Sequence, residues 1–231
     1  MLTLRSPVIA AALALSSAVV HAASFNPSAD FSLSGNPNGR WSYGYSQTLG
    51  GPLIPHATSG SNSGLDFWNT DISIGLPWVA HNSTALPMNW AGTTTVAPGA
   101  LSLHPGPNGQ VAILRFTAPS TGQYAINGAF FGQDYIGPTT TDVHLLLNGS
   151  SIFDGVVSDF GTSQPFNITT ALTAGSRLDF AVGFGSNQTY LYDSTGLAAT
   201  ITQVPEPTTL VLAGVAVGLL CLSRRRKTPA A

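Results

Sequence analysis

The sequence predicts an all-β fold: an antiparallel β-sandwich of the jelly-roll kind, flanked by a signal peptide and a C-terminal transmembrane helix. Short runs of β-branched and aromatic residues recur between turn-forming residues, and residues 23–203 lack the 3.6-residue apolar period of amphipathic helices. Each end of the chain carries an apolar run, and cations follow the second one. The sequence therefore divides into a leader (1–22), a β-sandwich domain (23–203) and a C-terminal segment (204–231).

The leader has the three parts of a secretory signal peptide. Arg5 supplies a positive charge, Val8 to Val20 form a short apolar run, and small residues lead up to Ala22. A membrane anchor is the alternative, but the run is short for a bilayer that needs about 20 apolar residues. We therefore predict export and cleavage after Ala22.

Strand-like runs follow one another at short spacing through the middle of the chain, as in a β-sandwich. Asn148-Gly149 lies between two of them and is typical of a tight hairpin. Residues 45 to 66 show little periodicity and many Gly, Ser and Pro, which predicts a long surface excursion. The predicted strands are 110–117, 123–131, 142–148, 150–154, 166–172, 177–185 and 197–203.

Charged residues are scarce and unevenly distributed. They make up 8% of the chain, against about 25% in a typical domain. Residues 23–203 contain three Arg, nine Asp and no Lys, so this domain carries a net charge of about −6. So few cations argue against nucleic-acid binding, and the missing Lys excludes a P-loop or a Schiff-base site there.

The C-terminal segment begins with Val204-Pro205-Glu206-Pro207, continues with an apolar run from Leu210 to Leu222, and then reaches Arg224-Arg225-Arg226-Lys227. Pro207 suits the first turn of a helix, which we predict over about 208–223 as a membrane span. The four cations form a basic stop that favours the cytoplasmic side, leaving the domain outside.

This order of features resembles the PEP-CTERM sorting signal of exported bacterial proteins. The resemblance implies an exosortase as processing enzyme, cleavage near Pro205-Glu206-Pro207, and an inner-membrane anchor before processing. It also implies a later place at the cell surface or in an extracellular matrix, with extracellular polysaccharide as partner. A tail anchor that stays in place is the alternative. Stretches such as Asp30–Leu33 and Leu103–Pro107 are similar to a region of other PEP-CTERM proteins, which implies a sandwich like that of carbohydrate-binding modules.

Motifs for catalysis are weak in this sequence. Gly60-Ser61-Asn62-Ser63-Gly64 has Asn where a nucleophile elbow needs Ser. A glycoside hydrolase needs two carboxyl groups around the bond; the domain offers Asp but no obvious pair. We predict no enzymatic activity, and keep as the alternative a secreted glycoside hydrolase that uses Asp66, Asp71, Asp134 or Asp159.

The sequence also contains residue types that bind metals in other proteins. His56, His81, His104 and His144 have no zinc-binding spacing, so we interpret them as structural residues. Calcium prefers several oxygen ligands in polar loops, and the acidic net charge suits a divalent cation. The candidates for a calcium site are Asp134, Asp154, Asp159 and Asp193, although the sequence contains no complete calcium-loop motif.

Aromatic residues gather in one part of the chain. All four Trp lie between residues 41 and 90. Aromatic faces can stack on sugar rings, or the same rings can fill the core of the sandwich. The predicted glycan-binding residues are Trp41, Tyr43, Tyr45 and Trp68. The predicted function is a non-catalytic surface or matrix protein that binds polysaccharide, with a purely structural matrix role as a further alternative.

Overall fold

The computed structural model describes residues 22–70 and 76–205, and every regular element in these two ranges is a β-strand. Among these residues no helix is found that is long and apolar enough for a membrane span. The predicted signal peptide, apart from Ala22, and the predicted helix over 208–223 lie outside the described residues. The predicted all-β class is confirmed.

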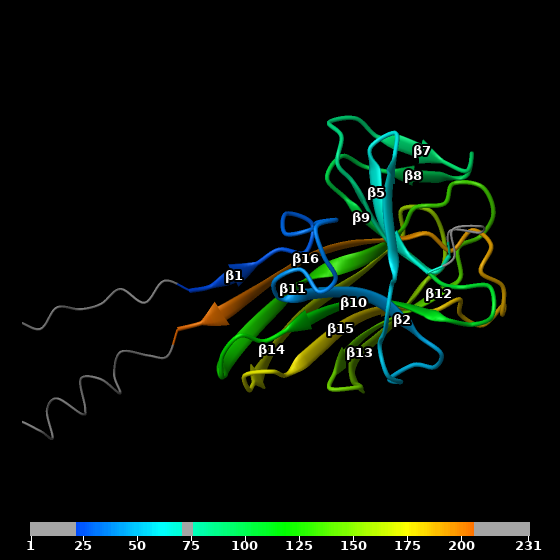
Figure 1. Ribbon diagram of the computed structural model, residues 1–231. Helices are drawn as coiled ribbons and strands as arrows, with labels where there is room; N and C mark the ends of the chain where they lie inside the picture. Colours follow the sequence, from blue (N-terminus) through cyan, green and yellow to red (C-terminus); the bar gives the residue numbers. More distant parts are fainter. Residues whose placement is uncertain (1–21, 71–75, 206–231) are drawn as a thin grey trace, which may run out of the picture.

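Two antiparallel sheets face each other and form a sandwich (Figure 1). The larger sheet has the order β14 (Ser163–Leu172), β11 (Gly122–Gly132), β16 (Thr195–Val204), β9 (Leu101–His104), β6 (Trp78–Asn82), β5 (Leu65–Asn69), β4 (Thr58–Asn62), and β1 (Ser24–Phe25) also pairs with β16. The smaller sheet has the order β13 (Ser150–Val157), β12 (Thr141–Leu147), β15 (Arg177–Val182), β10 (Val111–Thr117), β2 (Trp41–Ser46), β3 (Ile54–Pro55).

The main core lies between the two sheets. Phe130 on β11 and Phe166 on β14 meet Phe180 on β15 of the opposite sheet, with ring centroids 6.4 and 6.1 Å from that of Phe180. Each ring removes a large apolar area from water, so this layer contributes much of the stability of the fold. The alternation of side chains along each strand places these residues on the inner face.

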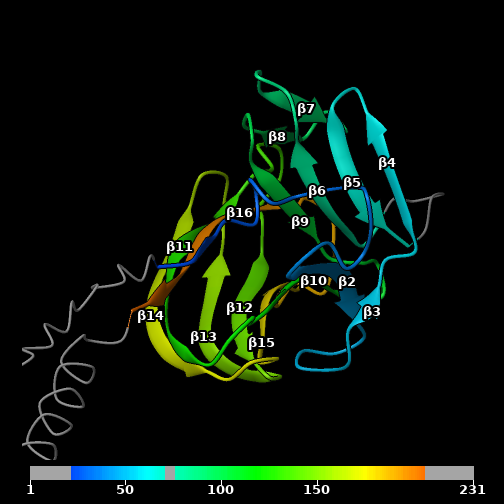
Figure 2. The same cartoon turned by 60° about the vertical axis from the view of Figure 1, so that its left-hand side comes forward.

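A separate hairpin covers part of the outer face of the larger sheet. Strands β7 (Met88–Trp90) and β8 (Thr94–Val96) form a two-stranded sheet, with an isolated bridge from Thr94 to Asp134, and they lie above β5 and β6 in Figure 2. Beneath them a small second core contains Leu65, Trp78, Ala80 and Val96. Along β6, Val79 points into the main core while Trp78 and Ala80 point outward to this second core. The hairpin therefore shelters residues that would otherwise face solvent.

The predicted hairpin at Asn148-Gly149 is confirmed. Strands β12 and β13 pair directly, and the two turn residues have φ angles of 53° and 91°. Both angles are positive, as a type I′ turn requires, and Asn and Gly adopt them at the lowest cost.

The predicted surface excursion over residues 45–66 is wrong in its central part. Strand β4 lies inside this region and pairs with β5 from Thr58 to Asn62. It is an edge strand whose side chains are exposed or half-buried, so no apolar alternation marks it in the sequence. The other strands before β10 also lie outside the predicted strand ranges, which begin at residue 110.

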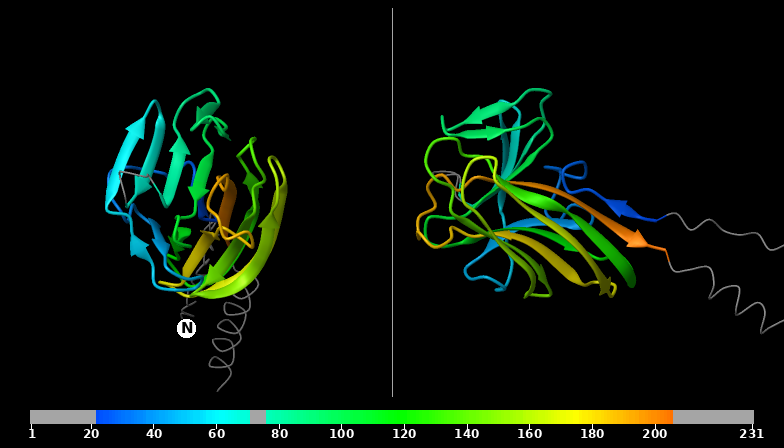
Figure 3. Two further views of the ribbon diagram at one scale, coloured as in Figure 1. Left: turned by 90° about the vertical axis from the view of Figure 1, so that its right-hand side faces the viewer. Right: turned by 180° about the vertical axis from the view of Figure 1, so that it is seen from behind.

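Both ends of the described chain lie at one end of the sandwich. Ser24 pairs with Thr202, so β1 and the end of β16 run side by side, as Figures 1 and 3 show. Strand β16 starts at the opposite end, which we call the distal end, and its ten residues span about 30 Å. Whatever lies at the distal end is thus held one strand length away from the C-terminal segment.

Candidate functional site: an aromatic pocket at the distal end

Three of the four aromatic residues predicted to bind glycan lie in the main core. Trp41, Tyr43 and Trp68 are 2%, 0% and 7% exposed. Tyr43 and Trp68 stack on each other, with centroids 5.8 Å apart and ring planes 5° from parallel. A ring covered on both faces cannot stack on a sugar, so the prediction is wrong for these three residues.

The polar atoms of these core rings already have protein partners. The indole N–H of Trp41 donates to Asp30 Oδ2 at 3.0 Å, and that of Trp68 donates to the carbonyl of Ser32 at 2.8 Å. Burial of Tyr43 raises the pKa of its hydroxyl to about 12. The polar groups of these residues therefore have hydrogen-bond partners inside the protein and are not available to a ligand.

Tyr45, the fourth predicted residue, is half-buried near the surface. Its ring lies 5.8 Å from that of His56, whose pKa is lowered to about 3 by burial, so this imidazole is neutral. Tyr45 also lines a small depression of about 190 Å³ together with Leu76 and Pro107. It remains a candidate for contact with a ligand.

A pocket of about 290 Å³ at the distal end is lined by a different set of aromatic residues. Trp90 lies edge-on to Trp78 at 5.8 Å, Trp78 lies edge-on to His104 at 5.8 Å, and His104 lies edge-on to Tyr190 at 6.2 Å. These four rings form a continuous aromatic wall. Tyr192, 37% exposed, also lines the pocket at the surface.

The wall residues come from strand ends that the sheet order brings together. Trp78 begins β6 and His104 ends β9, and these two residues are cross-strand partners. Trp90 ends β7, while Tyr190 belongs to the loop that leads into β16. Residues 78, 90, 104 and 190 are far apart in the sequence, so only the antiparallel pairing places them around one cavity.

The pocket lining also contains polar residues, among them one carboxylate. Asp134 Oδ1 accepts a hydrogen bond from the Thr94 hydroxyl at 2.6 Å, and Asp134 Oδ2 accepts one from the backbone N–H of Ser194 at 2.6 Å. The hydroxyls of Thr94 and Ser194 lie 2.9 Å apart. Asp134 therefore joins three segments of the pocket and has little capacity left for a ligand.

His104 is neutral in this pocket. Burial lowers its pKa, and its Nδ1 atom lies 2.8 Å from the carbonyl of Pro105, which can only accept. Nδ1 therefore carries the proton and Nε2 is an acceptor. None of the described residues lining the pocket is a cation, so the pocket suits a neutral ligand better than an anionic one.

Trp78, one of the residues that line this pocket, has a buried hydrogen-bond donor without a described partner. Its side chain is 6% exposed, and its buried indole N–H has no hydrogen-bond partner among the described residues. Leaving such a donor unpaired costs about 1–3 kcal/mol, so native proteins seldom do so without a reason. The aromatic wall thus combines apolar faces with one unsatisfied donor.

The four calcium candidates do not assemble into one site. Asp154 contacts His144 on the smaller sheet, Asp159 accepts from the backbone of Phe160 in a turn, and Asp134 is used as described above. Within the described ranges no group of three or more acidic, His or Cys residues is placed to hold a metal ion. The prediction of calcium binding by these residues gains no support.

Asp193 is a buried carboxyl group beside the pocket. Its Oδ1 accepts the backbone N–H of Thr140 at 3.0 Å, while Oδ2 is buried without a partner in the described part of the chain. Burial, together with the nearby charge of Asp134, raises its pKa to about 7. Asp193 therefore holds the loop before β16 at an energetic cost that grows with pH.

The carboxyl groups proposed for hydrolysis are also dispersed. Asp66 lies on β5 opposite Ser61, Asp159 lies in the turn after β13, and Asp71 lies outside the described residues. Asp134 is the carboxylate that lines the aromatic pocket. No second carboxylate stands across that pocket among its described lining residues, as a glycosidase pair would require.

His144 joins two strands of the smaller sheet as predicted for a structural residue. Its Nδ1 lies 2.5 Å from Asp154 Oδ1, and its Nε2 lies 3.0 Å from Asp142 Oδ2. Burial lowers the pKa of His144, but these two carboxylates outweigh burial and raise it overall. Both ring nitrogens are thus occupied by partners on β12 and β13.

Comparison with known protein families identifies the C-terminal segment. The fold and the pocket define an all-β sandwich with an aromatic cavity at one end. Residues 203–227 match the PEP-CTERM protein-sorting motif, and this match supports a protein of the kind that an exosortase processes. The matched segment contains Val204 to Pro207 and the cations 224–227, although Glu206, Pro207 and the cations lie outside the described residues. The motif implies an exported protein with a C-terminal membrane-anchoring region before processing.

Solved structures with some likeness to the chain are of several kinds. The CBM51 module from Clostridium perfringens GH95, in complex with methyl-galactose, has a TM-score of 0.35 and 10% identity over 64% of this chain and 94% of that one. A family 35 carbohydrate-binding module from Clostridium thermocellum has a TM-score of 0.30 and 18% identity, covering 50% and 85%. Rabbit GITRL has a TM-score of 0.29 and 20% identity, covering 41% and 74%. These low TM-scores assign neither ligand nor activity. No curated protein matches the chain.

Proposed function

We propose that the mature protein is a non-catalytic surface or matrix protein that binds neutral polysaccharide in the aromatic pocket at the distal end. Trp78 carries this proposal: a buried ring with an unpaired N–H, lining a cavity with Trp90 and Tyr190. Aromatic faces stack on the apolar faces of sugar rings, and a few placed polar groups fix the orientation of the ligand. A sugar hydroxyl is the kind of acceptor that the Trp78 N–H lacks, and the ring must turn toward the pocket to reach it, because the N–H is closed to solvent in the free protein.

The charge of the pocket supports a neutral glycan. His104 is neutral, and Asp134 has both oxygens engaged by protein donors. Without a cation in the described lining, a sulfated or phosphorylated polymer would meet no compensating charge. A sugar with unmodified hydroxyl groups avoids this penalty.

The position of the pocket supports binding while the protein is anchored. Strand β16 runs from the pocket at Thr195 to the sorting motif at Val204. A site at the membrane end would be crowded by the bilayer, whereas the distal pocket opens about 30 Å away from the C-terminal segment. In this proposal residues 1–22 are the removed signal peptide, 23–203 the binding domain and 204–231 the sorting segment.

Binding is tested by affinity electrophoresis of the processed protein. The gels contain dextran, galactomannan, soluble β-glucan or the exopolysaccharide of the producing cell. We expect retardation by at least one of these polymers. Trp90→Ala or Tyr190→Ala should weaken retention at least about tenfold, because each removes a stacking face. Val156→Ala, a change of an exposed residue on β13, is the matched control and should bind normally.

The same experiment separates the alternatives. Tyr45→Ala is expected to weaken binding less than Trp90→Ala, because Tyr45 lines a neighbouring depression that shares only Leu76 with the pocket. If Tyr45→Ala had the larger effect, the site would lie at Tyr45 instead. Release of reducing sugar from any polymer, and its loss in Asp134→Asn, would favour the hydrolase. No retention by any polymer would leave the structural matrix role.

The sorting segment has its own test. Replacing Arg224 to Lys227 with Ser and Gln removes the charge that holds this end on the cytoplasmic side. We expect the altered protein to be mis-sorted or released unprocessed in cell fractionation. Fractionation identical to that of the unaltered protein would show that the cations are not part of the signal.

A further inference from the structure

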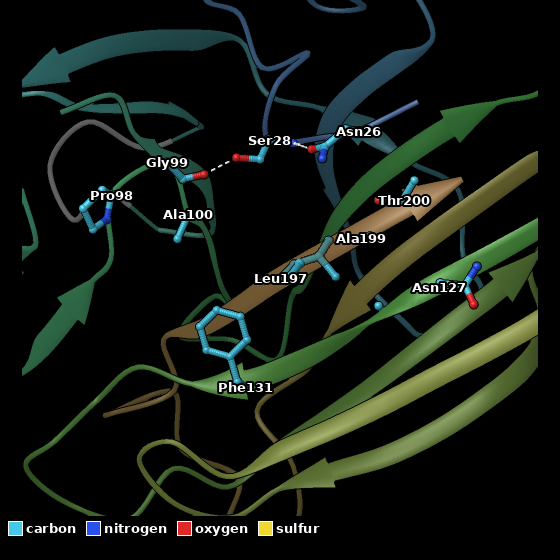
Figure 4. Close-up of a pocket in the computed structure, with 12 residues that line it drawn as sticks. Asn26, Ser28, Pro98, Gly99, Ala100, Asn127, Phe131, Leu197, Ala199 and Thr200 are labelled. Atoms are coloured by element: carbon cyan, nitrogen blue, oxygen red, sulfur yellow. Dashed lines mark hydrogen bonds between the residues drawn. The ribbon is translucent and has the colours of Figure 1, made fainter. Parts of the chain in front are cut away.

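A second cavity lies along β16. The segment between Thr93 and Ala100 separates it from the aromatic pocket. This second cavity has a volume of about 410 Å³ and is lined by parts of β11, β16, the segment after β1 and the loop before β9. Figure 4 shows Phe131 and Asn127 toward its two ends, with Leu197 and Ala199 between them and Gly99 opposite. We call this cavity the β16 groove.

The groove exists because one edge of β16 is left open over three residues. On that edge β9 pairs with Thr195 to Leu197 and β1 pairs with Ile201 and Thr202, so residues 198–200 have no strand partner there. Gln203 donates its N–H to Ala23 on the same edge. In an antiparallel ladder alternate residues bond to the same side, so the N–H and C=O of Ala199 face this edge.

The side chains of the groove resemble those of the aromatic pocket in chemistry. Phe131 is half-buried and leans across Gly196, its cross-strand partner, where a Cβ atom would lie 2.2 Å from the ring. The ring thus has the backbone on one side and the groove on the other. Asn127 and Thr200 are paired across the strands, and neither side chain has a hydrogen-bond partner among the described residues.

We infer that the β16 groove is a second binding subsite for the same neutral polysaccharide, which therefore binds as an extended chain across both cavities. The groove offers one aromatic ring, two unpaired polar side chains and the open backbone at Ala199. Its described lining contains no charged side chain. Such a set of groups recognises hydroxyl-rich neutral polymers. This inference rests on the proposed function.

The two cavities are close enough for one chain. Phe131 lines the groove and Asp134 lines the pocket, and three extended residues span about 10 Å. The segment between Thr93 and Ala100 borders the pocket at its start and the groove at its end. A polymer that fills both cavities passes over this segment, whereas a short oligosaccharide fills only one.

The test compares long and short chains of whichever polymer retains the protein. Calorimetry measures binding of its disaccharide and of a fragment several times longer. Ala198→Trp fills the groove, and Ala171→Trp places the same ring at an exposed position on β14 outside it, as the matched control. We expect Ala198→Trp to weaken binding of the long fragment about tenfold while leaving that of the disaccharide unchanged. Trp90→Ala should weaken both.

Other results of this test separate the groove from the proposed function. If Trp90→Ala weakens binding and Ala198→Trp behaves like Ala171→Trp, the groove is not a subsite, while the proposed function stands. If the unaltered protein binds no chain of either length, both the groove subsite and the proposed polysaccharide binding are wrong. Should Ala198→Trp fail to fold, Asn127→Ala serves instead, because this exposed side chain has no partner to lose. A severalfold loss confined to the long fragment supports the groove, and an unchanged affinity overturns it.

Discussion

The centre of the sandwich and its distal end use the same kinds of residue in opposite ways. In the centre, the indole N–H groups of Trp41 and Trp68 donate to Asp30 and Ser32. At the distal end, Trp78 N–H and Asp193 Oδ2 are buried without partners in the described part of the chain. Gln133 Oε1 and Thr139 Oγ1, which lie in the same stretches as Asp134 and Thr140, share this property.

In the proposed function, this difference separates a structural role from a binding role. Buried polar groups are nearly always satisfied, because an unpaired one loses its hydration without compensation. A region that collects several unpaired groups is destabilised in the free state, and a ligand with matching groups can relieve that cost. The centre stabilises the fold, and the distal end retains unmet hydrogen-bonding capacity, of which the Trp78 N–H belongs to a residue that lines the pocket.

The largest expected loss of folding stability follows a substitution in the centre of the sandwich. Trp41→Ala removes a ring that is 2% exposed and packs on Phe116 and Phe180. The cavity should lower the free energy of unfolding by about 3–5 kcal/mol. Urea unfolding followed by fluorescence measures this loss, with Trp90→Ala as the distal comparison. If the two substitutions cost the same, the centre would not be the stabilising region.

Asp193→Asn probes the distal end through pH. The ordinary pKa of Asp is 3.8 and that of folded Asp193 is about 7, so the folded state binds the proton more tightly. The contribution of Asp193 to the free energy of unfolding therefore falls as pH rises from about 4 to about 7 and stays low above that. The neutral Asn should raise stability at pH 8 by about 1–3 kcal/mol and have little effect at pH 4. A loss at both pH values would show that the carboxyl group is needed.

A matched pair of substitutions compares the two indole donors directly. Trp68→Phe leaves the Ser32 carbonyl without its donor and should cost about 1 kcal/mol beyond the change in ring size. Trp78→Phe removes a donor that has no described partner, so this additional cost should be absent. Trp78→Phe should instead weaken glycan retention. Equal losses of stability from both changes would contradict the division between centre and distal end.

The smallest expected change in folding stability follows substitution of His144, which lies away from both regions. Its pKa is raised above 6.5, so its contribution is complete below about pH 6.5 and is lost as pH rises through the folded value. The pKa values of Asp142 and Asp154 are lowered below 3.8, so their contribution is lost as pH falls through those values. His144→Gln should therefore cost most between about pH 4 and 6.5, and less than about 1 kcal/mol because Asp154 is exposed. A cost that increases above pH 8 would contradict this assignment.

Much of the fold was predictable, because strands with one buried face leave a period of two in the sequence. The strands from Val111 onward and the Asn148-Gly149 hairpin carry that signal. Strand β4 does not, since an edge strand of small polar residues buries almost no side chain. Trp68 showed why residue type alone cannot locate a site: the same ring serves the core or a ligand, and only its neighbours decide which.

The sequence by itself determined the all-β class, the acidic and cation-poor domain, and the C-terminal sorting motif, because these depend on composition and on contiguous residues. Only the tertiary structure decided which aromatic residues are buried and which line a pocket. Trp78, Trp90, His104 and Tyr190 come together through antiparallel pairing and the hairpin packed over it. Such contacts join residues distant along the chain, and their partners leave no local pattern in the sequence.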